Sequence, residues 1–282
     1  MFDLKSYLKS RAEEVNAALN EYLPENGDYM GNLGEVMRYS VFPGGKRFRP
    51  ILALAVCEAL GCDRASAMPA ACSFELIHCF SLVHDDLPCM DNDVERRGKP
   101  TCHVAYGEDT ALLAGDGLSI YAFEVAARSA EKVSAEATVR VIRELAYASG
   151  HPGMVGGQIL DMDAQHHGAD KDSLLAVHRA KTGALIRGAA RVGAIIAGAD
   201  EDQLQAVTEY GELVGLVFQI TDDILDYKDD PDPISFPGLY GMEDSRRMAA
   251  EATERALACI KQFGEAAEPL RALASYLLDR QS

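Results

Sequence analysis

The stretch AACSFELIHCFSLVHDD, residues 70–86, is almost entirely apolar until its last two positions, which are both aspartates. Its spacing predicts a helix with apolar side chains on most sides, and a helix of that kind is buried. The stretch ELVGLVFQITDDILD, residues 212–226, repeats this form, because an apolar run again ends in aspartates. Together the two stretches predict an all-α fold in which two buried helices end in carboxylates.

Helical periodicity extends over most of the chain, whereas alternating strand patterns are scarce. Pro50 suits a first helical turn and Gly61 suits a helix end, so residues 50–61 are expected to form one helix. No internal repeat or clear linker divides the sequence, so we expect one domain over residues 1–282 with about ten helices, several longer than 20 residues. The other helices are expected at residues 4–22, 65–86, 110–130, 135–149, 172–197, 201–228, 243–263 and 269–280.

The composition excludes several classes of protein. Hydrophobic residues make up 48% of the chain and the formal net charge is −17, which argues against nucleic acid as the main partner. No apolar run approaches the roughly 18 residues that a membrane span needs, and the first residues contain no apolar signal region. Seven cysteines without a C-x-x-C pair predict neither a disulfide framework nor a zinc site and favour a reducing, cytoplasmic location.

The aspartates at the two helix ends form the first candidate site. Pro88 cannot continue a helix, so the chain should turn after Asp85 and Asp86 and carry Asp91 back toward them. Asp222 and Asp226 are four residues apart and therefore share one helix face, although a solvated helix end would explain that pair alone. Carboxylates without histidine or thiolate suit Mg²⁺, which keeps water and substrate phosphate as further ligands. The pattern predicts a diphosphate held between two aspartate groups.

Basic residues form the second candidate site, since arginine and lysine both bind phosphate. A solvated face is the expected place for Arg47 and Lys99. A lone histidine on an apolar helix, such as His78 or His84, is more often a core residue than a functional one. The candidates for phosphate contact are Lys46, Arg49, Arg96, Arg97 and Lys181, the last of them followed by Thr182.

The segments GGKRFRP, LVHDDLPCMDNDVERRG, HRAKTGALI and FQITDDILD resemble the hallmark motifs of the trans-prenyl diphosphate synthases. The resemblance covers about residues 34–227, and DDLPCMD is similar to the bacterial and plastid branch, most of all to bacterial farnesyl diphosphate synthases (geranyltranstransferases). It implies the isoprenoid synthase fold, a bundle around a deep central cavity, in a homodimer. It also implies Mg²⁺-dependent head-to-tail condensation of isopentenyl diphosphate with dimethylallyl or geranyl diphosphate.

The resemblance implies a role for each residue that matches a family motif. About three Mg²⁺ ions per site would be held by carboxylates, and the diphosphates by cations. The implied metal ligands are Asp85, Asp86, Asp91, Asp222 and Asp226. The allylic substrate would contact Arg96 and Lys181 at its diphosphate and Thr182 and Gln219 at its reacting carbon. Isopentenyl diphosphate would contact Lys46, Arg49, His78 and Arg97. The segment GGQILDMD also resembles the family, with Gln158 and Asp161 as supporting or packing groups.

Product length is expected to depend on residues one helical turn before the first aspartates. Phe80 and Ser81 lie there, and five residues from Phe80 to Asp85 correspond to about 7.5 Å of helix. In the resembling family an aromatic residue at this depth goes with a C15 product, farnesyl diphosphate. Phe80 as a simple core residue is the alternative, and geranylgeranyl diphosphate is the alternative product.

One segment departs from the family pattern. After Asp226 the family usually has a flexible loop with lysines that close over the allylic diphosphate, and about a dozen residues of it are absent here. Pro233 stands where a lysine is expected, so the loop is either naturally short or omitted from the sequence. Two further functions therefore stay open: a terpene cyclase, which would need only one diphosphate site, and a non-catalytic partner subunit of a prenyl synthase.

Overall fold

The protein is a bundle of α-helices, as the sequence predicts. The computed structural model describes residues 2–25, 31–42, 44–229 and 231–279. Its helices are α1 (Leu4–Tyr22), α2 (Leu33–Val41), α3 (Phe48–Ala59), α4 (Met68–Asp85), α5 (Cys102–Tyr106), α6 (Glu108–Ala127), α7 (Ala135–Ser149), α8 (Met154–His167), α9 (Lys171–His178), α10 (Ala184–Ile196), α11 (Glu201–Asp226), α12 (Phe236–Tyr240), α13 (Met242–Cys259) and α14 (Glu268–Asp279). The described strands are β1 (Glu95–Arg96) and β2 (Lys99–Pro100), an antiparallel hairpin.

The helix count and lengths differ from the prediction. Fourteen α-helices lie in the described part of the chain, and there only α11, with 26 residues, is longer than 20, so the expectation of several such helices is wrong. The predicted helix 172–197 is divided by a π-helical turn at Arg179–Gly183. The helices α2, α5, α8 and α12 were not predicted, because each is short or rich in glycine or proline. The predicted last helix ends at Arg280, which lies outside the described residues.

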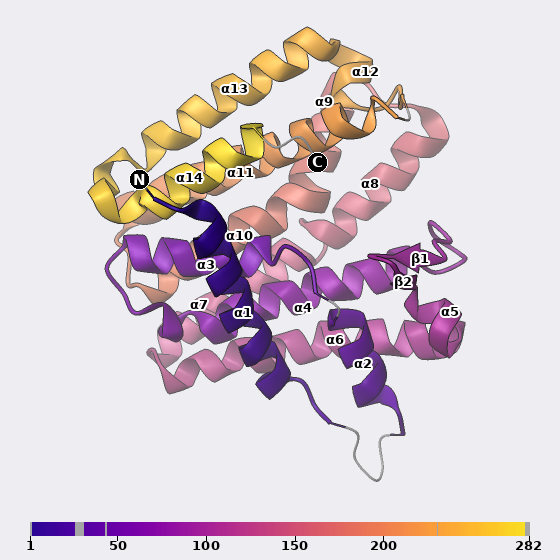
Figure 1. Cartoon of the computed structure of the whole chain (residues 1–282), viewed down its shortest axis with the longest axis horizontal. Helices are drawn as coiled ribbons and strands as arrows, with labels where there is room; N and C mark the ends of the chain where they lie inside the picture. The colour runs from indigo at the N-terminus through magenta and orange to yellow at the C-terminus, as the bar shows by residue number, and fades with distance from the viewer. Residues whose placement is uncertain (1, 26–30, 43, 230, 280–282) are drawn as a thin grey trace.

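Helix α10 lies at the centre of the bundle and packs against α3, α4, α7 and α11 (Figure 1). Its glycines allow this close approach. A Cβ atom at Gly188 would lie 2.7 Å from the ring of Phe74 on α4, and one at Gly193 would lie 2.3 Å from the carbonyl oxygen of Ala53 on α3. No helix in the described ranges has the length and apolar character that a membrane crossing requires.

Arg47 corrects the sequence analysis, which expected it on a solvated face. The residue is 1% exposed, and its guanidinium Nη1 donates to Glu75 Oε1 at 2.7 Å. Its Nε donates to Asn16 Oδ1 at 2.9 Å and its Nη2 to the carbonyl oxygen of Val41 at 2.8 Å. Arg47 therefore ties together α1, α2, α3 and α4 from inside the core, and a buried charge of this kind is tolerated because it is paired and hydrogen-bonded.

Replacing Arg47 by methionine is expected to lower the free energy of unfolding by about 3–5 kcal/mol, because the Glu75 carboxylate would stay buried without its partner. Urea unfolding measures this loss. Arg247→Ala is the matched control, since that arginine pairs with Asp244 on the exposed side of α13 and its removal should change stability little. Equal stabilities of the two variants would show that the buried ion pair has no structural role.

Candidate active site

The first aspartate group sits where α4 ends. Asp85 is the last residue of α4, and the backbone N–H of Asp91 donates to the carbonyl oxygen of Asp85 at 2.8 Å. The turn that Pro88 predicts is therefore confirmed, and it returns Asp91 to the end of the helix. Two carboxylates of this motif thus lie at the carboxyl end of a buried helix, where the helix dipole adds no positive charge to neutralise them.

The charges of this group are unfavourable without a cation. The pKa of Asp85 is raised to about 6, mainly by burial; Lys181 opposes the rise and the charge of Asp91 adds to it. Burial also raises the pKa of Asp91, and its neighbours Asp93 and Asp161 add to that shift. Carboxylates that resist ionisation in the metal-free protein are stabilised in their charged form by a bound cation.

Asp86 is held differently from Asp85. Its side chain is almost completely buried, and its Oδ1 accepts hydrogen bonds from Arg96 Nε at 2.8 Å and Nη2 at 2.5 Å. Arg96 also donates to Asp93 Oδ2 at 3.0 Å. The structure therefore places Asp86 and Arg96 against each other, and neither lines the two large cavities described below. The roles implied for the pair, metal ligand and phosphate contact, remain predictions.

The second aspartate group occupies the last turn of α11. Asp226 is exposed, Asp222 is half-buried, and the two share one helix face as predicted. Burial raises the pKa of Asp226, and the charges of Asp223 and Asp229 add to the shift. Asp223 points to other partners, since its Oδ2 accepts from the backbone N–H of Phe236 at 2.9 Å. The connection from α11 to α12 is thus fastened at its far end.

In the ranges that the structure describes, no three acidic, histidine or cysteine side chains converge into a metal cluster. The chemistry of the two groups nevertheless fits Mg²⁺, because their donors are carboxylate oxygens and because Asp85 is raised in pKa by burial among like charges. Few protein ligands per ion are usual for Mg²⁺, which fills its shell with water and phosphate. Asp85, Asp91, Asp222 and Asp226 could hold such ions.

Lys181 lies on the π-helical turn between α9 and α10, and this turn contacts both α8 and α11. The amine Nζ donates to Asp161 Oδ2 on α8 at 2.5 Å. Close contact with α8 depends on Gly157, where a Cβ atom would lie 2.1 Å from the backbone nitrogen of Lys181. A π turn often marks a functional position in a helix. Asp161 therefore supports Lys181, in agreement with its expected secondary role.

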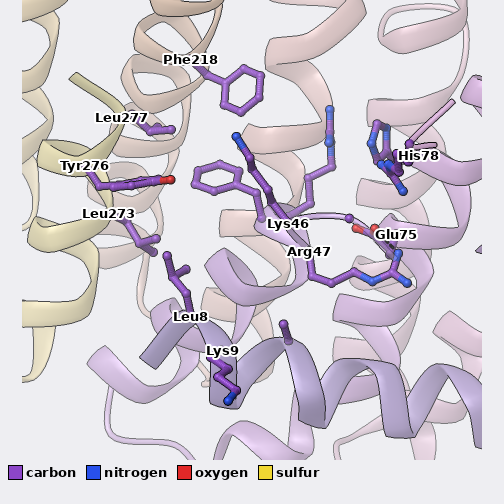
Figure 2. Close-up of a pocket in the computed structure, with 15 residues that line it drawn as sticks. Leu8, Lys9, Lys46, Arg47, Glu75, His78, Phe218, Leu273, Tyr276 and Leu277 are labelled. Carbon is purple, nitrogen blue, oxygen red and sulfur yellow. Dashed lines mark hydrogen bonds and ion pairs between the residues drawn. The ribbon is translucent and has the colours of Figure 1, made fainter. Parts of the chain in front are cut away.

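Two large cavities adjoin these residues. The first, of about 620 Å³, lies between the start of α3, α1, α4, α11 and α14 (Figure 2). The second, of about 610 Å³, lies between α4, α6, α8 and the π turn. Arg49 and His78 line both of them, so the two cavities meet at this pair.

The predicted site residues separate between the two cavities. The first contains all four residues expected to bind isopentenyl diphosphate: Lys46, Arg49, His78 and Arg97. The second contains five of the residues expected around the allylic substrate: Phe80, Ser81, Asp85, Lys181 and Thr182. Gln219 lines neither cavity. Its Nε2 donates to His178 Nδ1 at 2.9 Å. The fold therefore brings nine of the predicted site residues to the two cavities. The other predicted residues line neither cavity: Asp86, Asp91, Arg96, Gln219, Asp222 and Asp226.

The first cavity carries positive charge that the protein leaves largely unbalanced. Burial lowers the pKa of Arg49, and its Nε atom is buried with no hydrogen-bond partner among the described residues. Burial and the charges of Arg49 and Arg97 hold the pKa of His78 well below its usual value, so its ring stays neutral. Glu75, the acidic residue in the wall, is already paired with Arg47. An anion with several oxygens fits this wall.

Sequence reasoning missed the opposite wall of the first cavity. Lys9 on α1 and Tyr276 and Leu277 on α14 line it, and Phe218 on α11 packs against Phe48 with ring centroids 5.7 Å apart. Figure 2 shows these apolar side chains facing the cavity on the side away from His78. No local pattern marks them, because they become neighbours only when the two ends of the chain pack together.

An aromatic pair lines the second cavity. Phe80 meets the ring of His84 edge to face, with centroids 5.1 Å apart. His84 Nε2 lies 3.0 Å from the carbonyl oxygen of Leu112, and its ring occupies the space left by Gly115 on α6. His84 lines the second cavity beside Phe80, and the structural role expected of it stays a prediction.

Comparisons with known proteins agree with this geometry. The family model described as polyprenyl synthetase matches residues 31–237. The large subunit 1 of a chloroplastic heterodimeric geranylgeranyl pyrophosphate synthase from Arabidopsis thaliana is 40% identical over 300 aligned positions, which cover 100% of this chain and 80% of that protein. A geranylgeranyl diphosphate synthase from Cyanophora paradoxa is 40% identical over 295 positions, covering 100% of this chain and 98% of that protein. Both alignments are longer than this chain of 282 residues, so these relatives contain residues that it lacks.

Solved structures share the whole fold. An FPP/GFPP synthase from Zymomonas mobilis has 37% sequence identity and a TM-score of 0.93, covering 97% of this chain and 98% of that one. A geranyltransferase from Legionella pneumophila has 34% identity and a TM-score of 0.90, covering 99% and 97%. The all-α fold predicted from the two apolar helices is thereby confirmed.

Asp85→Asn is expected to stabilise the metal-free protein at neutral pH. An acid whose pKa is raised by folding destabilises the folded state above that pKa, and the effect vanishes below the unfolded value near 4. Since the pKa rises from 3.8 to about 6, the gain should be about 3 kcal/mol above pH 6 and should disappear as the pH falls to about 4. Urea unfolding in EDTA at several pH values measures it. A gain that is independent of pH would contradict the raised pKa.

Proposed function

The chain belongs to the polyprenyl synthetase family, and from this premise we propose that it elongates allylic diphosphates with isopentenyl diphosphate to make farnesyl diphosphate. The observation that carries the proposal is the junction of the two cavities at Arg49 and His78. One cavity offers a cationic wall without a matching anion, and the other is an apolar chamber with Asp85 and Lys181 at its rim. Two diphosphates can therefore bind side by side with their carbon chains in contact.

Each substrate would be oriented by its diphosphate. Lys46, Arg49 and Arg97 would hold isopentenyl diphosphate in the first cavity, with neutral His78 as a hydrogen-bonding group at the junction. Lys181 would hold the allylic diphosphate, and Thr182 would lie beside its first carbon. Holding two reactants in contact lowers the barrier because the loss of translational freedom is complete before the reaction begins.

The aspartates at the ends of α4 and α11 would bind Mg²⁺. Bound there, Mg²⁺ supplies charge that stabilises the negative diphosphate as it leaves. Lys181 adds positive charge on the same side and is itself oriented by Asp161. Preoriented charge of this kind acts where negative charge develops and needs no rearrangement during the reaction.

The reaction would proceed by ionisation, condensation and elimination. The carbon–oxygen bond of the allylic substrate breaks, and its electron pair leaves with the diphosphate. The double bond of isopentenyl diphosphate attacks the resulting allylic cation and forms the new carbon–carbon bond. A proton then leaves the adjacent carbon, and the released diphosphate is the nearest base. Apolar walls such as Leu185 and Met154 keep water from the cation.

The product length that we propose is C15, with Phe80 as the floor of the second cavity. The aromatic pair of Phe80 and His84 supports this, because both rings line the second cavity and Phe80 lies one helical turn before Asp85 on α4. The alternative product is C20. The names of the curated relatives, which are geranylgeranyl synthases, favour that alternative. A terpene cyclase is disfavoured by the separate cationic cavity, and a non-catalytic subunit by the presence of both aspartate groups.

A homodimer is part of the proposal. Helix α6 is apolar toward the core at Leu118 and also toward solvent, where Ile120 is 73% exposed. Exposed apolar side chains continue from α6 onto α7 and α8: Leu112, Leu113, Val139, Tyr147, Val155, Ile159 and Leu160. Leu112, Val155 and Ile159 also line the second cavity. Exposed apolar side chains gathered on a helix mark an interface, and a second copy of α6 would cover those of α6. The cysteine usage favours a cytoplasmic location.

Turnover should require Mg²⁺ and both aspartate groups. We expect Asp85→Ala and Asp222→Ala to lose at least about a hundredfold in rate, since each removes charge that stabilises the leaving diphosphate. The assay uses labelled isopentenyl diphosphate with geranyl diphosphate. Asp172→Ala, an exposed aspartate on α9, is the control and should keep full activity. Normal turnover by either site variant would refute the metal assignment.

Phe80→Ala should lengthen the product. If the ring is the floor of the cavity, its removal lets the chain pass and C20 or longer products appear. Product analysis by chain length with geranyl and isopentenyl diphosphates tests this. Phe123→Ala on α6 is the matched control, because that ring packs in the core and lines neither cavity. C15 as the sole product of an active Phe80→Ala enzyme would reject the floor, and a C20 product of the unmodified protein would favour the alternative.

A further inference from the structure

His178 is a half-buried residue that the motif analysis gave no role. It is the last residue of α9 and directly precedes the π turn that carries Lys181. Its ring stacks on Phe236 of α12, with centroids 5.2 Å apart and planes inclined by 12°. A histidine in such a place can be a simple packing residue, so the contacts of its two nitrogens decide between packing and function.

Both nitrogens are directed at one face of α11. Gln219 Nε2 donates to His178 Nδ1 at 2.9 Å, so Nδ1 is the unprotonated nitrogen and Nε2 carries the hydrogen. His178 Nε2 lies 3.5 Å from Asp223 Oδ2. Gln219 and Asp223 are four residues apart and therefore present their side chains to the same ring. Nδ1 is therefore hydrogen-bonded, whereas Nε2 is buried without a hydrogen-bond partner among the described residues and only faces the Asp223 carboxylate.

The bond to His178 sets the orientation of the Gln219 amide. Because Nε2 is used as the donor, the oxygen Oε1 is the end of the amide left for other contacts. An amide oxygen carries negative partial charge and stabilises a nearby cation, whereas an amide N–H would destabilise it. A free glutamine side chain rotates between these two orientations, and the histidine selects one of them.

We propose that His178 is a positioning residue for the allylic substrate, acting through Gln219. The inference rests on the proposed prenyl transfer and on the place beside the cationic carbon that the family resemblance implies for Gln219, which lines neither cavity in this structure. Gln219 also lies three residues before Asp222, on the face of α11 that ends in the second aspartate group. Fixing its amide therefore fixes a polar group next to the predicted diphosphate site.

His178 Nε2 contacts a different part of the structure from Nδ1. Asp223 accepts from the backbone N–H of Phe236 at 2.9 Å, and Phe236 begins α12. The ring of His178 thus contacts both members of this pair, by stacking on Phe236 and by facing Asp223 with Nε2. These contacts join the end of α9 to Asp223 on α11 and to Phe236 at the start of α12, and they are separate from the hydrogen bond to Gln219.

Three variants distinguish the contact of Nδ1 with Gln219 from the contact of Nε2 with Asp223. His178→Phe keeps the stack on Phe236 but removes both nitrogens. His178→Asn places an amide near the position of Nδ1, and His178→Gln places one near the position of Nε2. The proposal expects His178→Phe to lose about tenfold to a hundredfold in kcat/KM for geranyl diphosphate, the range that a misplacement of about 1 Å produces, with KM for isopentenyl diphosphate unchanged. The Asn variant should recover most of the loss, and the Gln variant should not.

A double-mutant cycle tests whether His178 acts through Gln219. If it does, His178→Phe combined with Gln219→Ala should be no slower than Gln219→Ala alone. Arg179→Ala, an exposed neighbour in the same turn, is the control and should match the unmodified protein. Multiplying losses in the double variant, or equal rates for the Asn and Gln variants, would overturn the proposal even if His178→Phe folds poorly.

A binding measurement separates this proposal from the proposed function. The probe is geranyl thiolodiphosphate with Mg²⁺, which binds without reacting, and its dissociation constant is measured by calorimetry. Absence of turnover in the unmodified protein would refute the prenyl transferase activity. Unchanged affinity and unchanged kinetics in His178→Phe, beside an active unmodified protein, would refute only the role of His178.

Discussion

Carboxylates at the end of a buried apolar helix repel one another and lose hydration, and this constraint organises the whole site. Burial and like charge raise the pKa of Asp85, so its charged form needs positive charge nearby. Lys181 on the π turn supplies part of this positive charge, and cations from solution would supply the rest. An apolar helix also supplies the dry wall that an allylic cation needs. The buried helix therefore has two effects: it makes its terminal aspartates favour a bound metal ion, and its apolar side chains exclude water from the reaction.

Two arginines close together in sequence show how the fold divides positive charge between structure and function. Arg47 is enclosed by Glu75, Asn16 and a backbone carbonyl, and it joins four helices. Arg49 is two residues away, faces both cavities and has a buried Nε without a partner among the described residues. A guanidinium in which each nitrogen has a protein partner is structural, whereas one with a buried nitrogen left unpaired can bind an anion. His178 and Gln219 extend this logic to a neutral pair, where one hydrogen bond selects the orientation of an amide.

Much of the fold and site could be predicted because it depends on local chemistry. Apolar spacing placed α4 and α11, Pro88 placed the turn that brings Asp91 back to Asp85, and Gly61 ended α3. The helix α8 was missed, since its glycines suggest a loop until the packing of Gly157 against Lys181 is known. The wall of the first cavity formed by α1 and α14 was also missed, because the sequence of neither helix indicates that the two pack together.

The sequence by itself determined which candidate groups the protein has for its chemistry: two sets of aspartates, several cations and an aromatic residue one helical turn before the first aspartates. These follow from composition and spacing, which set the face of a helix that a side chain occupies. Only the tertiary structure decided which helix faces pack against each other. It buried Arg47 and opened Arg49 to the cavities, paired Asp86 with Arg96, and turned Gln219 toward His178. The physical reason is that helix periodicity is local, whereas the neighbour of a face is chosen by packing of the whole bundle.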